Sequence, residues 1–192
     1  MDSPPIAGLR RWLVDAENAG APHPWSAIFV TVSADGDPSA RTVTLKRLDR
    51  DSLLFTSALW TRKVAELRAN PKVAIAFHWP GLGRQTLIRG TASEGDRRLA
   101  GELFAERGLD HQLQAHVSRQ GQVIDSLEPL RRRRLELIEE LDGGPVPCPD
   151  GWGVVRVDPE CVEFWEETPD RLHDRIEHWR VDGEWNIRRL AP

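Results

Sequence analysis

The sequence predicts an α+β protein built on an antiparallel β-barrel. Several short strand-like segments follow one another, separated by turn signals such as Asp35-Gly36 and Pro80-Gly81. Helical patterns cluster apart from them, mainly between Asp96 and Leu141. Strands and helices do not alternate, and the chain has no G-x-G-x-x-G loop or P-loop motif, so a doubly wound parallel sheet is not expected.

The first part of the chain predicts a helix, a meander of three strands and a second helix. The first helix has apolar residues at i, i+3, i+4 and i+7, and Asn70-Pro71 ends the second. The helices are expected over Leu9–Ala19 and Thr61–Ala69, and the three strands over Ala27–Val32, Ala40–Lys46 and Ser52–Ser57.

The rest of the chain predicts five more strands around the helical segment. About three helices are expected within residues 96–141, and a Gly- and Pro-rich connection follows. The strands are expected over Val73–His78, Arg84–Gly90, Trp152–Val157, Arg175–Val181 and Glu184–Leu190, the last two joined at Asp182-Gly183. We expect a single domain over 1–192, with a helical segment at 96–141 and C-terminal strands at 152–190.

Charge, hydropathy and cysteine content argue against several classes of protein. The 192 residues carry a net charge of −4, so a basic surface for nucleic acid or an anionic membrane is not expected. No apolar run is long enough to span a membrane, and the start lacks the pattern of a signal peptide, so we expect a cytoplasmic protein. Two cysteines are too few for a disulfide framework or a thiolate metal site.

The segment Trp60-Thr61-Arg62-Lys63 is a candidate anion site. It begins a predicted helix, where free N–H groups and the helix dipole favour an anion and where Thr61 can cap through its hydroxyl. Cations are disfavoured in a first turn, so Arg62 and Lys63 are easier to explain if a phosphate binds there. The alternative is an ordinary solvated first turn.

Arg41 and Lys46 lie on a predicted strand and face opposite sides of it. Alternation places Arg41 with Val43 and Leu45, so its charge needs a partner if that face is buried. The alternative is that both charges reach water at the strand edge. Gln85 and Gln120 carry amides that can bind the carbonyls and nitrogens of a heterocycle.

A second charged cluster, Arg-Leu-His-Asp-Arg, follows Trp165 near the C-terminus. It fits either a surface salt-bridge patch or the wall of a site for a flat anionic molecule. Metal and hydrolase sites are not expected, because the histidine pairs lack i, i+4 spacing and no G-x-S-x-G elbow is present. The remaining parts suit a phosphorylated aromatic cofactor.

With these residues in view, the chain resembles the pyridoxamine 5′-phosphate oxidase family, whose members bind flavin mononucleotide (FMN) on a split β-barrel. The resemblance runs from about Leu9 to Pro192. It is carried, in order, by "RTVTLK", "TRK", "NPKVAIAFHW", "GRQ", "VSRQ", "GWG", "EFW", "RLHDR" and the terminal "W-x-I-x-RLAP".

The resemblance implies a homodimer with FMN at the interface and a small phosphorylated aromatic substrate, oxidised with O2 as acceptor and H2O2 released. Its implied FMN contacts are Arg41, Thr42, Thr56, Thr61, Arg62, Lys63, Gln85, Gln120, Trp165 and Arg175. Its implied substrate contacts are Lys46, Arg107, His111, Arg171 and His173; Lys46 and Arg107 would bind the substrate phosphate, while Arg171 and His173 would position the ring and are the candidate catalytic residues.

Three positions depart from the family pattern. Leu103 stands where the family usually has a tyrosine, His111 where it has a serine, and Gly121 replaces a serine beside FMN. The resemblance as a whole makes oxidation of pyridoxamine or pyridoxine 5′-phosphate the leading hypothesis, whereas Leu103 and His111 raise the first of two alternatives. A related FMN oxidase acting on another reduced aromatic, as in phenazine-type metabolism, and a non-catalytic carrier of flavin or pyridoxal phosphate remain alternatives.

Overall fold

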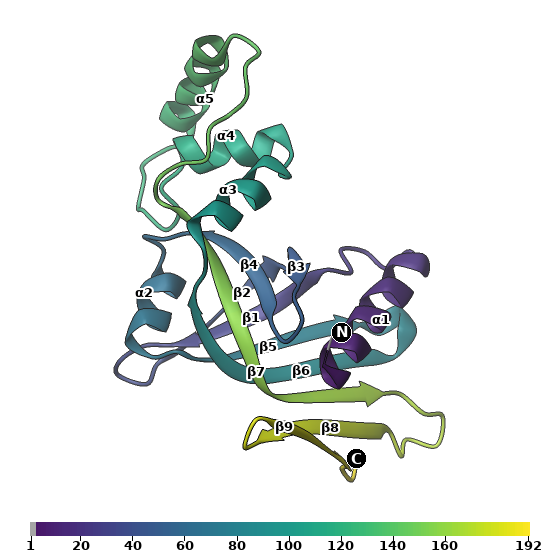
Figure 1. The fold of residues 1–192 in the computed structure, drawn as a ribbon. Coiled ribbons are helices and arrows are strands. Elements are labelled where there is room, and N and C mark those ends of the chain that lie inside the picture. The colour runs from purple at the N-terminus through teal and green to yellow at the C-terminus, as the bar shows by residue number, and fades with distance from the viewer. Residues whose placement is uncertain (1–2) are drawn as a thin grey trace. The chain divides into compact units, whose positions relative to one another are not determined.

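The computed structural model describes residues 3–192, and within them nine strands form one sheet with five α-helices (Figure 1). The predicted α+β fold with a curled, antiparallel half-barrel is confirmed. The chain forms two compact units. The first comprises the chain up to Phe55, Glu66–Ser93 and Arg156–Pro192, and the second comprises Thr56–Ala65 and Glu94–Val155. The expectation of a single domain stays a prediction.

The described helices include none that is both long enough and apolar enough to cross a membrane.

The central strands of the sheet follow the predicted pattern. Strand β1 (Ser26–Val32) pairs antiparallel with β2 (Pro38–Thr44) on one side and with β5 (Lys72–Trp79) on the other. A short 3-10 turn, Pro80–Leu82, joins β5 to β6 (Arg84–Glu94), its antiparallel neighbour. Side chains alternate between the two faces of these strands, which buries Phe29, Ile75 and Ile88 on one face.

The predicted meander of the first three strands is wrong. The sheet order is β2-β1-β5-β6-β7-β4-β3, so β4 (Leu53–Ala58) lies between β7 (Trp152–Glu166) and the short β3 (Arg47–Leu48). Sequence proximity favours pairing between neighbouring strands, but β4 is buried and requires a partner on each side. On one side the partner is β7, a strand about a hundred residues further along the chain.

Strand β7 continues nine residues beyond the predicted end at Val157 and passes through Pro159. Gly90 of β6 makes this possible. A Cβ atom at Gly90 would lie 2.2 Å from the carbonyl oxygen of Asp158 and 2.9 Å from Cα of Pro159. The absent side chain lets the backbones of β6 and β7 approach closely at this point.

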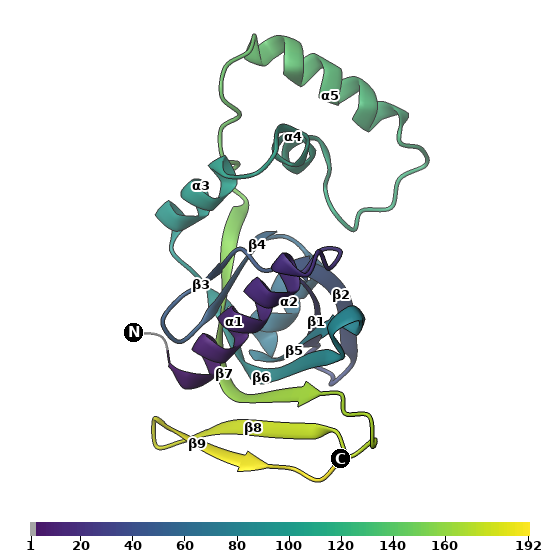
Figure 2. The same cartoon turned by 90° about the vertical axis from the view of Figure 1, so that its right-hand side faces the viewer.

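The C-terminal strands form a hairpin. Strand β8 (Asp174–Val181) pairs antiparallel with β7 and with β9 (Glu184–Arg189), as Figure 2 shows. Asp182 and Gly183 both have positive φ angles, 49° and 87°, as expected for the predicted two-residue hairpin turn.

Helix α1 (Pro4–Asn18) begins five residues before the predicted Leu9. Proline lacks an N–H group that the first turn would leave unpaired anyway, so Pro4 and Pro5 start the helix rather than precede it. The helix buries Leu9 and Leu13, and Gly8 lies against the ring of Phe164.

The second unit contains the three predicted helices, α3 (Arg97–Ala105), α4 (Leu109–Val117) and α5 (Glu128–Leu141). Their shared core includes Phe104, Leu113, Leu137 and Trp152. The four arginines at 131–134 each form an ion pair with a nearby acidic side chain of the second unit. Helix α2 (Arg62–Ala69) has its first residues in this unit and its end in the first unit.

Candidate functional site

Arg41 is held in a polar network inside the first unit. Its Nη2 lies 3.2 Å from Oε2 of Glu66, and its Nη1 donates to Oγ1 of Thr31 at 2.5 Å and to the carbonyl of Phe29 at 3.2 Å. Glu66 also accepts hydrogen bonds from the hydroxyls of Thr31 and Ser39. Of the two alternatives for Arg41, the structure has the paired one: Arg41 shares a partly buried face with Val43 and forms an ion pair with Glu66.

Hydroxyls and an ammonium group gather at the start of α2 in the second unit. The buried Nζ of Lys63 donates to Oγ of Ser57 at 3.0 Å and to Oγ1 of Thr61 at 3.3 Å. The hydroxyl of Thr61 donates to the carbonyl of Ala58 at 2.8 Å, and the backbone carbonyl of Thr61 accepts the N–H groups of Val64 and Ala65. The capping role of its hydroxyl stays a prediction. Arg62 is exposed at the first helical position.

The cluster near the C-terminus is built around the loop that joins β7 to β8. The rings of Trp165 and His173 lie 4.7 Å apart between centroids. Nδ1 of His173 accepts a hydrogen bond from the backbone N–H of Thr168 at 3.2 Å, so a neutral ring carries its proton on Nε2. Arg171 is exposed and has a left-handed backbone with φ of 63°.

Arg175 pairs with a carboxylate of the neighbouring strand. Its Nε donates to Oε1 of Glu163 at 2.8 Å, and its Nη1 donates to the carbonyl of Ala191 at 3.1 Å. The hydrogen bond to Glu163 raises the pKa of the Arg175 guanidinium. The remaining N–H groups of Arg175 are directed by these two contacts, which restricts the orientation of its side chain.

Arg107 occupies a half-buried position in the second unit. Its guanidinium lies 4.2 Å from the ring centroid of Trp152, and its Nη2 donates to the carbonyl of His111 at 2.9 Å. Its Nε is buried without a hydrogen-bond partner among the described residues. Burial lowers the pKa of Arg107 below that of a solvated guanidinium. Because an arginine remains charged at neutral pH, this group is suited to bind an anion.

The other predicted residues are less constrained. Gln85 is half-buried on β6 opposite His78, and Gln120 is exposed in the segment after α4. Thr56 is half-buried on β4. The exposed residues are Thr42, Lys46 and His111. Leu103 is fully buried in α3 and contributes to packing.

Contacts therefore join some predicted residues and not others. Trp165 contacts His173 in the first unit, and Thr61 contacts Lys63 in the second. Arg41 and Arg175 each pair with a glutamate that the sequence did not single out, Glu66 and Glu163. Helical spacing gave no signal for Glu66, because it is two residues from Val64 and one from Leu67, and such positions lie on different faces of a helix.

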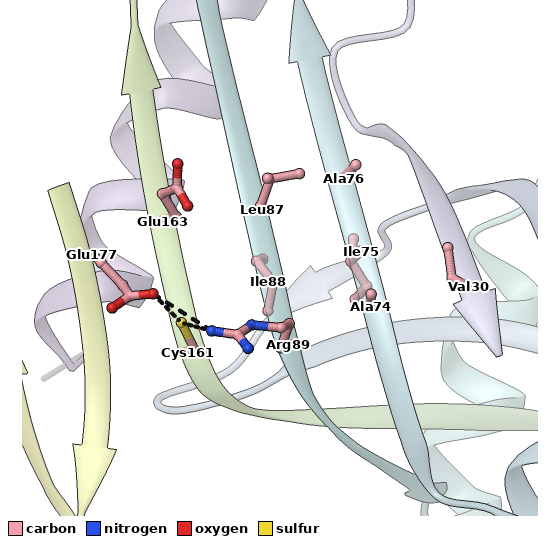
Figure 3. Close-up of a pocket in the computed structure, with 10 residues that line it drawn as sticks. All are labelled: Val30, Ala74, Ile75, Ala76, Leu87, Ile88, Arg89, Cys161, Glu163 and Glu177. Carbon is pink, nitrogen blue, oxygen red and sulfur yellow. Dashed lines mark hydrogen bonds and ion pairs between the residues drawn. The ribbon is translucent and has the colours of Figure 1, made fainter. Parts of the chain in front are cut away.

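The first unit also carries a cavity of about 360 Å³ on the outer face of the sheet, shown in Figure 3. Its floor is apolar and includes Val30, Ala74 and Leu87. One wall is polar: Nη2 of Arg89 lies 3.2 Å from Sγ of Cys161, which lies 3.3 Å from Oε1 of Glu177. Burial raises the pKa of the Cys161 thiol, so the thiol stays protonated and is not a candidate nucleophile.

The antiparallel half-barrel defines a split-barrel protein. A pyridoxamine 5′-phosphate oxidase-related, FMN-binding protein from Nostoc punctiforme superimposes on the chain with a TM-score of 0.80 at 17% identity, covering 100% of both chains, and this shows the shared fold. PhzG from Burkholderia lata, solved in complex with tetrahydrophenazine-1-carboxylic acid, gives a TM-score of 0.93 at 28% identity, covering 98% of this chain and 92% of that one.

Sequence comparison identifies the family. Residues 14–133 match the family described as pyridoxamine 5′-phosphate oxidase, and residues 152–192 match the pyridoxine 5′-phosphate oxidase C-terminal dimerisation region. A pyridoxine/pyridoxamine 5′-phosphate oxidase of Rubrobacter xylanophilus is 41% identical over 191 residues, covering 100% of this chain and 88% of the relative. One of Acidothermus cellulolyticus is 40% identical, covering 98% and 86%. The chain belongs to the pyridoxamine 5′-phosphate oxidase family, a family of oxidoreductases.

Proposed function

We propose that this protein is an FMN-dependent oxidase that converts pyridoxamine or pyridoxine 5′-phosphate to pyridoxal 5′-phosphate, with O2 as the electron acceptor and H2O2 as the second product. The observation that carries the phosphorylated substrate is Arg107. Its half-buried guanidinium is stacked on Trp152 and has a buried Nε without a partner among the described residues. A phosphate oxygen would satisfy that donor and offset the cost of burying the charge.

The residues present fit a phosphorylated flavin. Ser57, Thr61 and Lys63 form a group of hydroxyl and ammonium donors at the start of α2, with Arg62 at the first helical position. Such donors at a helix N-terminus suit a phosphate. We propose that Thr61, Arg62 and Lys63 hold the FMN phosphate, and that Arg41, Thr42 and Thr56 also contact the cofactor.

The ring side of FMN is assigned to other residues. We propose that Gln85, Gln120, Trp165 and Arg175 contact the flavin. The ion pair with Glu163 supports this role for Arg175, because it fixes the direction of the guanidinium before any ligand binds. The chemistry that FMN supplies when bound is acceptance of a hydride from the substrate carbon and transfer of the electrons to O2.

The chain itself orients the substrate. Arg107, with Lys46 and His111, would bind the substrate phosphate, while Arg171 and His173 would position the pyridine ring. Since Nδ1 of His173 accepts the Thr168 N–H, its Nε2 is the nitrogen that can donate to a substrate oxygen or nitrogen. These residues bind and orient the substrate. Holding the reacting atoms in alignment can raise the reaction rate by orders of magnitude.

Two observations support a homodimer. The region at 152–192 matches a dimerisation region, and it contributes Cys161, Glu163 and Glu177 to the wall of the apolar cavity in Figure 3. Ile28 and Leu87 are 44% and 38% exposed on the same sheet, each paired with Ala76. We propose that a second copy covers this face. Leu87→Glu should then convert the dimer to a monomer in light scattering; an unchanged dimer would place the interface elsewhere.

The test of the activity begins with the visible spectrum of the purified protein, which reports bound FMN. Peroxide release is then followed with pyridoxine 5′-phosphate, pyridoxamine 5′-phosphate and unphosphorylated pyridoxine. We expect turnover of the two phosphorylated compounds and a KM at least about 100-fold higher for pyridoxine, since a charged hydrogen-bonded contact contributes roughly 1.5–3 kcal/mol and phosphate offers several. Bound FMN without turnover of either phosphate would contradict the proposal.

A second candidate is the oxidation of a reduced phenazine-type compound. It is favoured by the 0.93 TM-score to PhzG and by Leu103, which is buried in the core and offers no hydrogen bond to a phosphate. The kcat/KM values for the two substrates decide between the candidates. Turnover of a reduced phenazine carboxylic acid with a kcat/KM above that of pyridoxine 5′-phosphate would favour the second.

A further inference from the structure

The loop between β7 and β8 carries both proposed ring-positioning residues, and a single carboxylate organises it. Oδ1 of Asp170 accepts a hydrogen bond from the hydroxyl of Thr168 at 2.7 Å and another from the backbone N–H of Leu172 at 3.1 Å. The bond from Thr168, followed by that from Leu172, lowers the pKa of Asp170. The carboxylate is therefore ionised at neutral pH and engaged with its own loop.

Arg171 lies between these contacts with a φ of 63°. The left-handed region is unfavourable for a long side chain, so the surrounding structure has to hold it there. The bond from Leu172 N–H to Asp170 spans Arg171 and forms an Asx-turn. The N–H of Arg171 also donates to the carbonyl of Thr168 at 3.1 Å. These bonds determine where the Arg171 side chain leaves the backbone.

Thr168 links the same carboxylate to His173. Its hydroxyl donates to Asp170, while its backbone N–H donates to Nδ1 of His173 at 3.2 Å. The imidazole also lies against the ring of Trp165, with the two ring planes at 51°. The position of Thr168 thus determines both the tautomer of His173 and the direction in which Nε2 points.

We propose that Asp170 is a positioning residue for substrate oxidation. It holds the left-handed backbone of Arg171 and, through Thr168, the tautomer and orientation of His173. The proposal rests on the proposed function, in which Arg171 and His173 contact the substrate ring. It goes beyond that function by assigning the geometry of both contacts to one exposed carboxylate that need not touch the substrate.

The test compares Asp170→Ala with Asp170→Asn. Asparagine keeps an acceptor oxygen and favours Asx-turns, whereas alanine removes the acceptor. We expect Asp170→Ala to lower kcat at least about tenfold, because displacement of a positioning group by about 1 Å costs up to about 100-fold. KM should change less than threefold, since the phosphate contacts are elsewhere, and Asp170→Asn should restore kcat to within about threefold of the parent. Asp35→Ala, at an exposed turn of the same unit, is the control.

A structural role and a positioning role are separated by a double-mutant cycle. In a His173→Ala background, Asp170→Ala should lose part of its logarithmic effect on kcat, because one of the two groups through which it acts is missing while Arg171 remains. A full, additive effect would overturn the proposal, as would an unchanged kcat in Asp170→Ala alone.

Nitrogen-15 NMR of the His173 ring provides a readout that is independent of turnover. The parent should show a single tautomer with the proton on Nε2, and Asp170→Ala should show a mixture. If the parent protein oxidises neither phosphorylated substrate, the proposed function fails and the NMR comparison alone decides the role of Asp170. Identical ring spectra in the parent and in Asp170→Ala would overturn it.

Discussion

Glu66→Ala should destabilise the protein far more than an ordinary loss of an ion pair. The side chain of Glu66 is 6% exposed and that of Arg41 is 22% exposed, so the pair is largely shielded from water. The substitution removes the ion pair with Arg41 and the acceptor of the hydroxyl hydrogen bonds of Thr31 and Ser39.

The expected magnitude follows from the cost of leaving a buried charge unpaired. Removing one partner of a buried ion pair typically costs about 3–5 kcal/mol. Arg41 keeps its bonds to Thr31 and to the carbonyl of Phe29, and it can reach some water, so the lower end applies. We expect a loss of about 2–4 kcal/mol in the free energy of unfolding, and a smaller loss for Glu66→Gln, which retains an acceptor oxygen.

Urea unfolding followed by tryptophan fluorescence measures this loss, with the m-value as a check that the unfolding reaction is unchanged. The matched control is Glu160→Ala, which breaks an ion pair with Lys72 whose side chains are 51% and 63% exposed. An exposed pair contributes about 0–1 kcal/mol. If Glu66→Ala costs no more than Glu160→Ala, the reasoning from burial is refuted.

Three further predictions concern packing and pH. Gly90→Ala should lower the free energy of unfolding by at least about 2 kcal/mol, because its Cβ would lie 2.2 Å from the backbone oxygen of Asp158. Gly101→Ala in helix α3, where a Cβ would meet nothing within 4 Å, should instead raise it by about 0.5–1 kcal/mol. Urea unfolding of both variants tests the contrast. Burial acts to raise the pKa of Glu177, but hydrogen bonds and cations beside it outweigh that and lower it. Its stabilisation is therefore present above the unfolded pKa of about 4.3 and lost as the pH falls through the lower folded value, and Glu177→Gln should flatten the acid limb of the stability curve. Burial lowers the pKa of His178 below its unfolded value, so the unfolded state takes up the proton first and stability should fall as the pH drops below about 6.5; an equal slope in His178→Asn would contradict this.

Local patterns predicted most of the secondary structure. The helical segment divides into three helices, and the two hairpins at Pro80–Leu82 and Asp182-Gly183 form as expected. These features depend on turn chemistry and on side-chain periodicity within a few residues, which a single sequence displays directly. The two largest boundary errors, at the start of α1 and the end of β7, both involve prolines that the local context accommodates, while β6 also runs four residues beyond its predicted end and β2 is shifted by two.

The pairing of the strands could not be predicted from local sequence patterns. Strand β4 fits a meander locally, yet it lies between β7 and β3. The pairing of distant strands is decided by burial over the whole sheet and by close approaches such as that of Gly90 to Asp158. Neither can be obtained from periodicity along one strand.

The sequence by itself determined the fold class, the family and the residue types proposed for the site, because all three are carried by short runs such as "RTVTLK" and "RLHDR" that need no knowledge of the chain path. Alternation placed Arg41 with Val43 and Leu45, where its charge needs a partner if that face is buried. Only the tertiary structure decided that the partner is Glu66, 25 residues away, and that Asp170 holds Arg171 in a left-handed backbone. The physical reason is that a charge or a strained backbone is stabilised by whichever groups the folded chain brings within hydrogen-bond distance, and that is a property of the packed structure.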